Sequence, residues 1–261
     1  MIEGIIFDYD GTIGMTLERQ HNWFMHWAKL NNISFPLTDF NEFKEVYNQI
    51  LNEKGIQAFY DQFDLPCKMN DLNHPVWIAY NSFKKDNPVK YYPGIKEAIK
   101  KIHKIGELSE DSQRNQRLRM IINTNNSWGS IYSELKKQKI LGLFDSFVTK
   151  EVLVNYHGAG KGTAITKPSK ISVALALNIL NTDGGATIHV GDTLTDLAAS
   201  IDVRRHPQIH RKERLITIGA GWGYESVDRL NQGLKTEIGT EHFNHVLEEP
   251  AMLPEVIKQY M

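Results

Sequence analysis

Short apolar runs alternate with helix-like patterns along most of the chain. The runs cover residues 4–7, 119–123, 144–149, 186–190 and 215–218. Runs this short, bounded by polar residues or glycine, are typical of buried parallel strands. Between them, apolar residues spaced three or four apart predict helices over residues 128–139 and from about residues 95, 171 and 195. The alternation predicts an α/β fold with a doubly wound, mainly parallel, Rossmann-like sheet that binds ligands beyond the carboxyl ends of its strands.

A segment rich in aromatic side chains interrupts this alternation between the first and second runs. Its spacing fits amphipathic helices that pack on one another, and core packing explains the aromatic residues better than a cofactor site does. The sequence predicts a helical cap domain, residues 14–90, covering the active-site end of a core domain made of residues 1–13 and 91–261. Residues 106–117 are polar and are predicted to be an exposed loop. The aromatic positions include Trp23, Phe24, Trp27, Phe40, Phe43, Phe59, Tyr60, Phe63, Trp77, Tyr80 and Phe83.

The composition is that of a soluble globular protein. The 261 residues carry a formal net charge of -1 and are 41% hydrophobic. This balance gives no reason to expect nucleic acid as a partner, because phosphate-binding surfaces usually show a basic excess. No apolar stretch approaches the roughly 18 residues of a membrane span, and the N-terminal run does not resemble a signal peptide. We therefore expect a cytoplasmic protein without a membrane partner. A single cysteine, Cys67, allows no internal disulfide and is expected to be an unreactive thiol.

Two carboxylates stand directly after the first apolar run. Asp8 and Asp10 lie two residues apart and precede a Gly-Thr turn, where both side chains can converge on a ligand. Adjacent carboxylates repel each other and need a cation or a shared proton. A hard divalent cation such as Mg²⁺, which prefers oxygen ligands, meets that need. On its own, an Asp-x-Asp pair is weak evidence, since many loops contain one.

Further polar residues follow the later strands. Thr124 and Asn125 offer a hydroxyl, an amide and backbone donors suited to phosphoryl oxygens. Lys167 precedes a proline that starts a helix and supplies a point charge for an anion. Asp192 and Asp196 lie four apart, so a helix that begins near residue 193 turns both toward the first strand. Each of these residues, taken by itself, has an ordinary structural explanation. Their occurrence in order, each at a predicted strand end, favours a single catalytic site.

Taken together, these motifs resemble those of the haloacid dehalogenase superfamily of phosphohydrolases. The resemblance extends over nearly the whole chain and includes the cap inserted after the first motif. Residues 92–94 and 219–224 resemble the phosphoglycolate phosphatase-like subgroup. The matching motifs are Ile-Ile-Phe-Asp-Tyr-Asp-Gly-Thr at residues 5–12, Ile-Ile-Asn-Thr-Asn at residues 121–125, Lys-Pro at residues 167–168, and Gly-Asp-Thr-Leu-Thr-Asp at residues 191–196.

The resemblance implies a role for each matched residue. Asp8 is expected to be the nucleophile, and Asp10 the acid and base; an aspartate at position 10 favours phosphate esters over dehalogenation. The expected phosphate-binding residues are Gly11, Thr124, Asn125 and Lys167, and the expected Mg²⁺ ligands are Asp8, Asp10 through its backbone carbonyl, Asp192 and Asp196.

These roles imply a Mg²⁺-dependent phosphatase that hydrolyses a small phosphorylated metabolite through a phospho-aspartate. Phosphoglycolate is the leading candidate by resemblance alone, and the oligomeric state is not predicted. One alternative is a phosphosugar mutase, to whose cap the positions Thr16, His21 and Trp27 are loosely similar. Another is a non-catalytic binding or regulatory protein, against which the intact motifs argue. Residues 13–16 lack the acidic-serine pair that relatives usually carry at the cap hinge.

Several other features are open to a functional interpretation, but each is better explained as ordinary structure. The stretch from Arg204 to Arg214 is rich in basic residues and is expected to be a solvated loop. His206 and His210 have a metal-compatible spacing without matching ligands. The glycine-rich residues 157–163 do not fit a nucleotide-binding loop. His21 and His26 are expected to be surface or packing residues.

Overall fold

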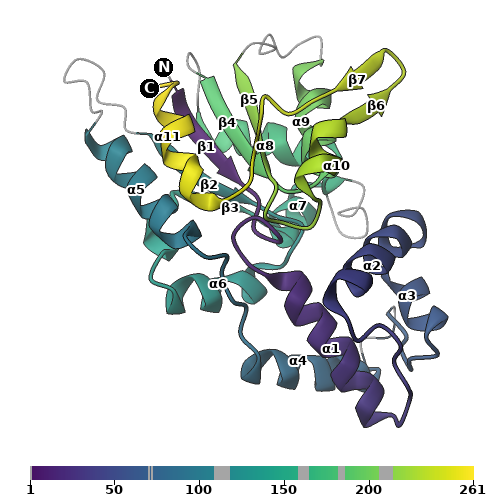
Figure 1. Ribbon diagram of the computed structural model, residues 1–261. Helices are drawn as coiled ribbons and strands as arrows, with labels where there is room; N and C mark the ends of the chain where they lie inside the picture. The colour runs from purple at the N-terminus through teal and green to yellow at the C-terminus, as the bar shows by residue number, and fades with distance from the viewer. Residues whose placement is uncertain are drawn as a thin grey trace. The chain divides into compact units, whose positions relative to one another are not determined.

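The computed structural model describes residues 2–69, 71, 73–108, 118–157, 165–181, 186–205 and 214–261. Contacts within the chain divide it into two compact units, Met1–Gly14 with Tyr91–Met261, and Met15–Lys90. The predicted cap, residues 14–90, starts one residue before the observed unit Met15–Lys90 and ends at the same residue. We refer to these as the core unit and the helical unit and describe each by itself (Figure 1).

The core unit is built on a sheet of six strands, all of whose pairings are parallel. The strand order is β3-β2-β1-β4-β5-β8, so the first strand lies in the middle of the sheet. The predicted α/β fold is therefore confirmed. The strands are β1 (Ile2–Phe7), β2 (Arg119–Asn123), β3 (Ser146–Val148), β4 (Ala186–Gly191), β5 (Leu215–Ala220) and β8 (His245–Leu247).

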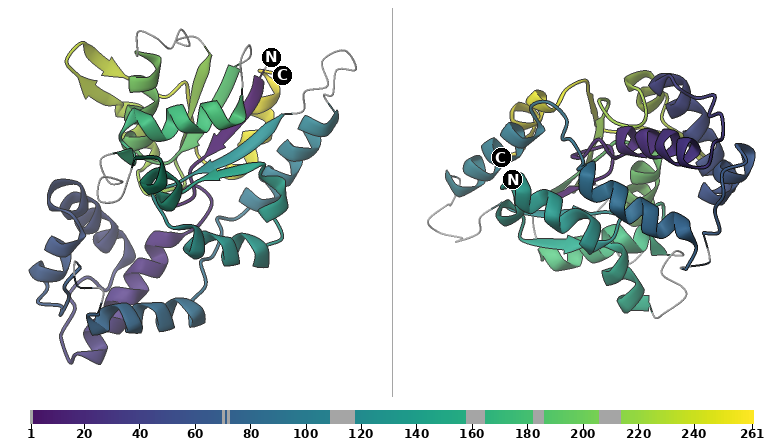
Figure 2. Two further views of the ribbon diagram at one scale, coloured as in Figure 1. Left: turned by 180° about the vertical axis from the view of Figure 1, so that it is seen from behind. Right: turned by 90° about the horizontal axis from the view of Figure 1, so that it is seen from below.

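Helices cover both faces of this sheet because its side chains are apolar on both faces. Phe7 lies in a core cluster with residues of α5, α6 and α11, whereas Ile6 packs with residues of α8 and α9. From behind, α8 lies across the strands (Figure 2, left). Burying each large apolar side chain contributes about 1.5–3 kcal/mol. The helices are α5 (Ile95–Leu108), α6 (Trp128–Lys137), α7 (Lys150–His157), α8 (Lys170–Leu180), α9 (Leu194–Arg204), α10 (Val227–Gln232) and α11 (Leu253–Lys258), with 3-10 turns η1 (Leu141–Leu143) and η3 (Pro250–Met252).

Several elements of the core unit differ from the sequence expectation. The sequence did not indicate α7, α10, α11, β8 or the antiparallel hairpin formed by β6 (Leu234–Thr236) and β7 (Gly239–Glu241). The strands β6, β7 and β8 have three residues each, which is too few to show the alternation of apolar and polar residues that is typical of a strand. The predicted loop at residues 106–117 was wrong for residues 106–108, which complete α5; residues 109–117 lie outside the described residues. A Cβ on Gly106 would lie 2.8 Å from Leu118 Cβ, so close packing there favours glycine.

The helical unit contains four helices packed around aromatic side chains. Phe24 and Phe59 are fully buried, with ring centroids 4.6 Å apart, and Trp23 donates to the Tyr60 hydroxyl at 2.8 Å. The interpretation of the aromatic residues as core is therefore confirmed. The helices are α1 (Thr16–Leu30), α2 (Phe40–Lys54), α3 (Ile56–Gln62) and α4 (Pro75–Asp86). Among the described helices, none is both long and apolar enough to cross a membrane.

His21 belongs to this aromatic core. Its Nε2 donates to the Leu37 carbonyl at 2.8 Å, and its ring lies 4.6 Å from the ring of Phe43. His26 on the same helix is exposed. The packing role expected for His21 is confirmed, and the buried hydrogen bond explains why a polar ring is tolerated there.

Candidate active site

Asp8 begins the site at the carboxyl end of the central strand. Its backbone N–H donates to the Val190 carbonyl at 2.9 Å and extends the pairing of β1 with β4 by one residue. The side chain then leaves the sheet beside the end of β4, where Asp192 follows. Asp8 is only 5% exposed, so its carboxylate has lost most of its contact with water and needs hydrogen-bond or ion-pair partners within the protein.

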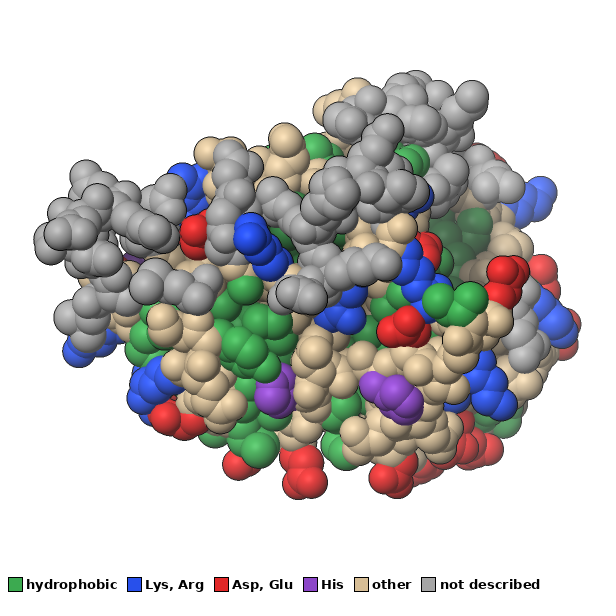
Figure 3. All heavy atoms as spheres, turned by 90° about the horizontal axis from the view of Figure 1, so that it is seen from above, with side chains coloured by type: hydrophobic (Ala, Val, Ile, Leu, Met, Phe, Trp, Pro, Cys, Tyr) green, Lys and Arg blue, Asp and Glu red, His purple; other side chains and the backbone are tan. Residues whose placement is uncertain are grey.

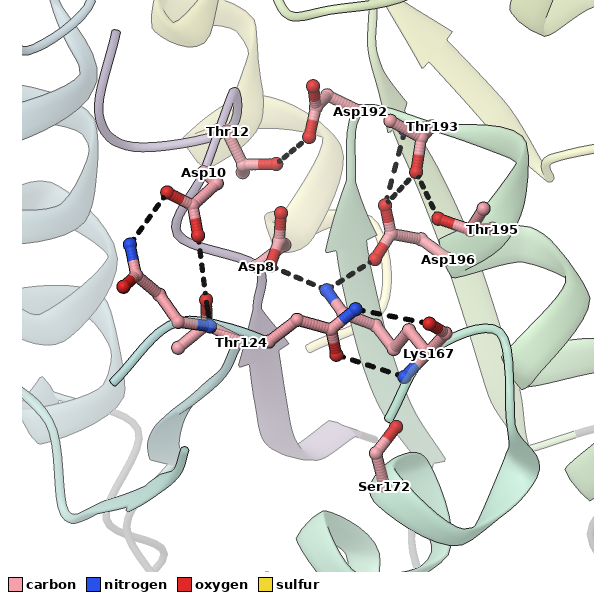
Figure 4. Close-up of polar contacts among 12 residues, drawn as sticks. Asp8, Asp10, Thr12, Thr124, Lys167, Ser172, Asp192, Thr193, Thr195 and Asp196 are labelled. Carbon is pink, nitrogen blue, oxygen red and sulfur yellow. Dashed lines mark hydrogen bonds and ion pairs between the residues drawn. The ribbon is translucent and has the colours of Figure 1, made fainter. Parts of the chain in front are cut away.

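Lys167 provides the main partner for that carboxylate. Its ammonium group lies 2.5 Å from Asp8 Oδ1 and 2.6 Å from Asp196 Oδ1, bridging the two acids (Figure 4). Asn125 holds the lysine backbone in place: its Oδ1 accepts from the Lys167 N–H at 2.9 Å, and its Nδ2 donates to the Lys167 carbonyl at 3.1 Å. The side chain of Asn125 therefore positions Lys167, while phosphate binding by Asn125, expected through its backbone, stays a prediction.

Two further carboxylates complete this cluster. Asp192 is fully buried and accepts from the Thr12 hydroxyl at 3.0 Å and from the Tyr224 backbone N–H at 2.7 Å. Asp196 lies in the first turn of α9, where its Oδ2 accepts from the N–H of Thr193 at 3.2 Å and from its hydroxyl at 2.8 Å. This capping interaction fixes the start of the helix and with it the direction of the Asp196 side chain.

Three buried carboxylates therefore face one ammonium group. Oxygens of Asp8, Asp192 and Asp196 all lie within 4.8 Å of one another. Nearby His189 adds no positive charge, because burial lowers the pKa of its imidazole to about 4. The cluster thus has an excess of negative charge in a dry environment, which is costly without a further cation. An all-oxygen set of this kind fits a hard divalent cation such as Mg²⁺.

The same burial controls the protonation of the cluster. Burial raises the pKa of Asp8 to about 7, against the opposing attraction of Lys167. Burial and the neighbouring Asp8 raise the pKa of Asp192 well above its usual range. For Asp196, burial is the largest single influence and raises the pKa, but the attraction of Lys167 together with hydrogen bonds from Lys167 and Thr193 holds the pKa below its usual value. Near neutral pH, the metal-free site therefore binds protons that a cation would displace.

Gly11 allows the first loop to approach Asp192 closely. Its φ is +82°, and a Cβ at this position would lie 2.0 Å from Asp192 Oδ2. The Gly11 N–H donates to the Gly14 carbonyl at 2.9 Å and closes the turn after β1. Gly223 also approaches Asp192 closely, since a Cβ there would lie 2.3 Å from Asp192 Cβ and 2.5 Å from the Gly11 carbonyl oxygen. The role of Gly11 in phosphate binding stays a prediction, but its role in packing follows directly from these distances.

Asp10 points away from the carboxylate cluster. Its Oδ2 accepts from the Thr124 hydroxyl at 2.9 Å, and its Oδ1 accepts from Asn126 Nδ2 at 3.1 Å (Figure 4). The structure thus brings together the three side chains predicted at the metal, Asp8, Asp192 and Asp196, while Asp10 was expected to contribute its backbone carbonyl. The Thr124 hydroxyl, predicted to contact phosphoryl oxygens, is engaged with Asp10.

Comparison with known proteins now adds to this geometry. The sequence profile of the haloacid dehalogenase-like hydrolases matches residues 5–204. The chain belongs to this family. The predicted family resemblance is therefore confirmed. The match includes Asp8, Asp10, Thr124, Lys167 and both carboxylates of the last motif.

Solved structures share the fold of this family member over its whole length. A proposed phosphatase from Clostridium difficile superposes with a TM-score of 0.65 at 15% identity, covering 98% of each chain. A predicted phosphoglycolate phosphatase from Haemophilus somnus 129PT gives 0.62 at 14% identity, also covering 98% of each chain. The haloacid dehalogenase-type hydrolase YfnB from Bacillus subtilis, whose structure was solved with bound magnesium, superposes with a TM-score of 0.62 at 13% identity, covering 98% of each chain. No curated protein matches the sequence.

Some residues of this haloacid dehalogenase-like site were not predicted from the sequence. Asn126 directly follows the predicted Thr-Asn pair, but nothing local indicates that its amide reaches Asp10. His189 lies behind Asp196, with its Nδ1 2.7 Å from Ser200 Oγ and its Nε2 without a hydrogen bond. The sequence signal for His189 is weak, since it is one of two polar residues, with Thr187, in the short strand β4.

The remaining candidates that the structure describes lie outside the site. Cys67 is free, and burial raises the pKa of its thiol to about 11, which confirms that it is not an activated nucleophile. Arg204 Nε donates to the Leu215 carbonyl at 2.8 Å, and Arg205 pairs with Glu241 of the β6–β7 hairpin at 2.5 Å. These two arginines thus have structural partners. The two histidines at residues 206 and 210, and residues 158–163 of the glycine-rich stretch, lie outside the described residues.

The raised pKa of Asp8 gives a testable pH dependence. A folded-state pKa of about 7 against 3.8 means that the folded protein binds the extra proton, so the associated stability is present at low pH and is lost as the pH rises through 7. We expect the melting temperature of chelated protein to fall between about pH 5.5 and pH 8. Mg²⁺ should restore stability most strongly at the higher pH.

The variant Asp8→Asn is the matched control for this measurement, because it removes the titrating carboxyl group. Its melting temperature in chelator should depend less on pH over the same range. Equal or greater stability of the chelated wild-type protein at the higher pH would contradict the expectation.

Proposed function

We propose that this haloacid dehalogenase-like protein is a Mg²⁺-dependent phosphatase that hydrolyses phosphate monoesters through a phospho-aspartate on Asp8. The observation that supports this most directly is the position of Lys167, whose ammonium group bridges Asp8 and Asp196 at 2.5 and 2.6 Å. A buried ammonium beside a buried carboxylate can hold both the nucleophile and a phosphoryl oxygen. Phosphoryl transfer depends mainly on such positioning and charge neutralisation.

In the first step, a carboxylate oxygen of Asp8 attacks phosphorus in line with the ester bond. The bond from phosphorus to the ester oxygen breaks, and the leaving alkoxide takes a proton from the carboxyl group of Asp10. Lys167 and the Asn125 backbone N–H neutralise the transferring phosphoryl group. The products of this step are the free alcohol and the acyl phosphate of Asp8.

In the second step, the ionised carboxylate of Asp10 takes a proton from a water molecule. The water oxygen attacks phosphorus, the acyl phosphate bond breaks, and Asp8 is regenerated with release of inorganic phosphate. Asp8, Asp192, Asp196 and the Asp10 carbonyl would hold Mg²⁺, which when bound supplies positive charge to the nucleophile and the phosphoryl oxygens.

The proposed substrate is a small phosphorylated metabolite, with phosphoglycolate as the first compound to test. Both connections to the helical unit leave the core beside the site, where Gly14 pairs with Tyr91 and with Asp10. In the face shown in Figure 3, basic and acidic side chains of the described residues are intermixed, and this face shows no continuous basic surface of the kind that follows a nucleic acid backbone. A cytoplasmic location and the absence of nucleic acid and membrane partners stay predictions.

A panel of about 100 phosphate esters, scored by phosphate release with and without Mg²⁺, tests this proposal. We expect release from a few small alkyl phosphates and from 4-nitrophenyl phosphate, and its loss on removal of the metal ion. Failure to release phosphate from any ester in the presence of Mg²⁺ would contradict the proposal and favour a binding or regulatory protein. Slow hydrolysis with isomerisation of a sugar phosphate, accelerated by a sugar bisphosphate, would indicate a mutase.

A further inference from the structure

Asn126 fixes one oxygen of the proposed acid–base residue. Its Nδ2 donates to Asp10 Oδ1 at 3.1 Å, while the hydroxyl of Thr124 donates to Asp10 Oδ2 at 2.9 Å. Because each oxygen has its own donor, the carboxylate group cannot rotate without breaking a hydrogen bond. The two hydrogen bonds therefore fix the orientation of the Asp10 carboxyl group, the proposed acid of the first step and base of the second.

Asn126 is itself held by three other hydrogen bonds. Its backbone N–H donates to Thr124 Oγ1 at 3.1 Å, and its backbone carbonyl accepts from the Lys150 N–H at 3.0 Å at the start of α7. Its Oδ1 accepts from the Ser127 N–H at 2.8 Å. Since Oδ1 is occupied by a donor, the other side-chain atom must be the nitrogen, and the amide therefore presents its donor to Asp10.

The two donors to Asp10 differ in what they can do when the carboxyl group carries a proton. The hydroxyl of Thr124 can rotate and accept, whereas the Nδ2 of Asn126 can only donate. The hydrogen bond from Asn126 is therefore the one with a fixed direction, which makes Oδ1 the fixed point of the Asp10 carboxyl group.

We propose that Asn126 is a positioning residue that holds Asp10 for proton transfer to the leaving group. This inference rests on the proposed phosphatase function and concerns one step of it. Proton donation matters when the leaving group is a basic alkoxide, whereas 4-nitrophenolate leaves readily as an anion. Loss of the Asn126 amide should therefore slow alkyl ester cleavage more than aryl ester cleavage.

The test compares kcat/KM of the variants Asn126→Ala and Asn126→Asp on two substrates. Asn126→Asp keeps the shape and the acceptor for Ser127 but replaces the amide donor by a carboxylate oxygen beside Asp10. For the best alkyl phosphate from the panel we expect kcat/KM to fall about 30-fold, and for 4-nitrophenyl phosphate by no more than about threefold. Asp10 also serves as the base in the second step, so the variants should hydrolyse the acyl phosphate of Asp8 more slowly. With 4-nitrophenyl phosphate, kcat should therefore fall and an initial burst of 4-nitrophenol should precede the steady state. Asn178→Ala, at an exposed position of α8, is the matched control.

Equal losses of kcat/KM on both substrates would overturn the inference, because a structural role does not depend on the leaving group. Unchanged kcat/KM on both would overturn it as well. If both variants fail to fold by circular dichroism, the role of Asn126 is structural and the inference is again overturned. Absence of turnover by the wild-type protein on every ester would overturn the proposed function together with it, so the two failures are distinguishable.

Discussion

Replacement of Asp8 by asparagine is expected to abolish phosphatase turnover while the fold is retained. An amide oxygen is a poor nucleophile. Among the described residues, no other carboxylate directly follows β1 and could take the place of Asp8 as nucleophile. Phosphate release from the best substrate should fall by at least about 10⁴-fold, as is typical when a nucleophile is removed. The wild-type protein should also gain the mass of one phosphoryl group when it is quenched during turnover, and the variant should not.

The variant should not lose stability in the absence of metal. Asparagine keeps an acceptor for Lys167, and it removes one of three buried carboxylates that face a single ammonium group. Asp202→Asn is the matched control, because Asp202 is exposed on α9 and lies outside the cluster. Phosphate release by Asp8→Asn at a rate comparable to that of this control would refute the assignment of the nucleophile.

The main features of the site could be predicted because each of its main residues belongs to a short motif that is visible in the local sequence. Asp8, Thr124 and Asp192 each follow a short apolar run, and the carboxyl ends of parallel strands meet at one edge of a sheet. No knowledge of distant contacts was needed to place them together. The same reasoning located the aromatic core of the helical unit, since its spacing follows the helical period.

Other features could not be predicted because they depend on contacts between segments far apart in the chain. The amide of Asn126 reaches Asp10 across 116 positions of sequence, and a local pattern carries no information about that pairing. The strands β6, β7 and β8 are too short for a period of two to be visible. For His21, the sequence left a surface position and a packing position open, and the hydrogen bond to the Leu37 carbonyl shows how the ring is accommodated in the core.

These hydrogen bonds also explain how the site can be both charged and dry. Every acid of the site has at least one donor within hydrogen-bonding distance, from Lys167, Thr12, Thr124 or Thr193. Donors reduce the cost of burying a carboxylate but do not cancel its charge. Among the described residues, the site therefore depends on the buried ammonium group of Lys167 more than on any single hydrogen bond.

Replacement of Lys167 by methionine is accordingly expected to destabilise the protein strongly. Methionine fills similar space, but it leaves Asp8 and Asp196 without their ion-pair partner inside the protein. Breaking a buried pair in this way costs about 3–5 kcal/mol. We expect the free energy of unfolding, measured with urea in chelator at about pH 8, to fall by that amount. The loss should be smaller at about pH 5.5, where the buried carboxyl groups can take up protons.

Three comparisons make the Lys167→Met prediction decisive. Lys100→Met, an exposed position on α5, should change the free energy of unfolding by less than about 0.5 kcal/mol. Adding Asp8→Asn to Lys167→Met should recover part of the loss, because it removes one of the carboxylates left unpaired. Mg²⁺ should recover part of it as well, since the cation replaces the missing positive charge. A loss below about 1 kcal/mol, equal at both pH values, would show that Lys167 does not compensate the buried carboxylates, and the electrostatic account of the site would have to be abandoned.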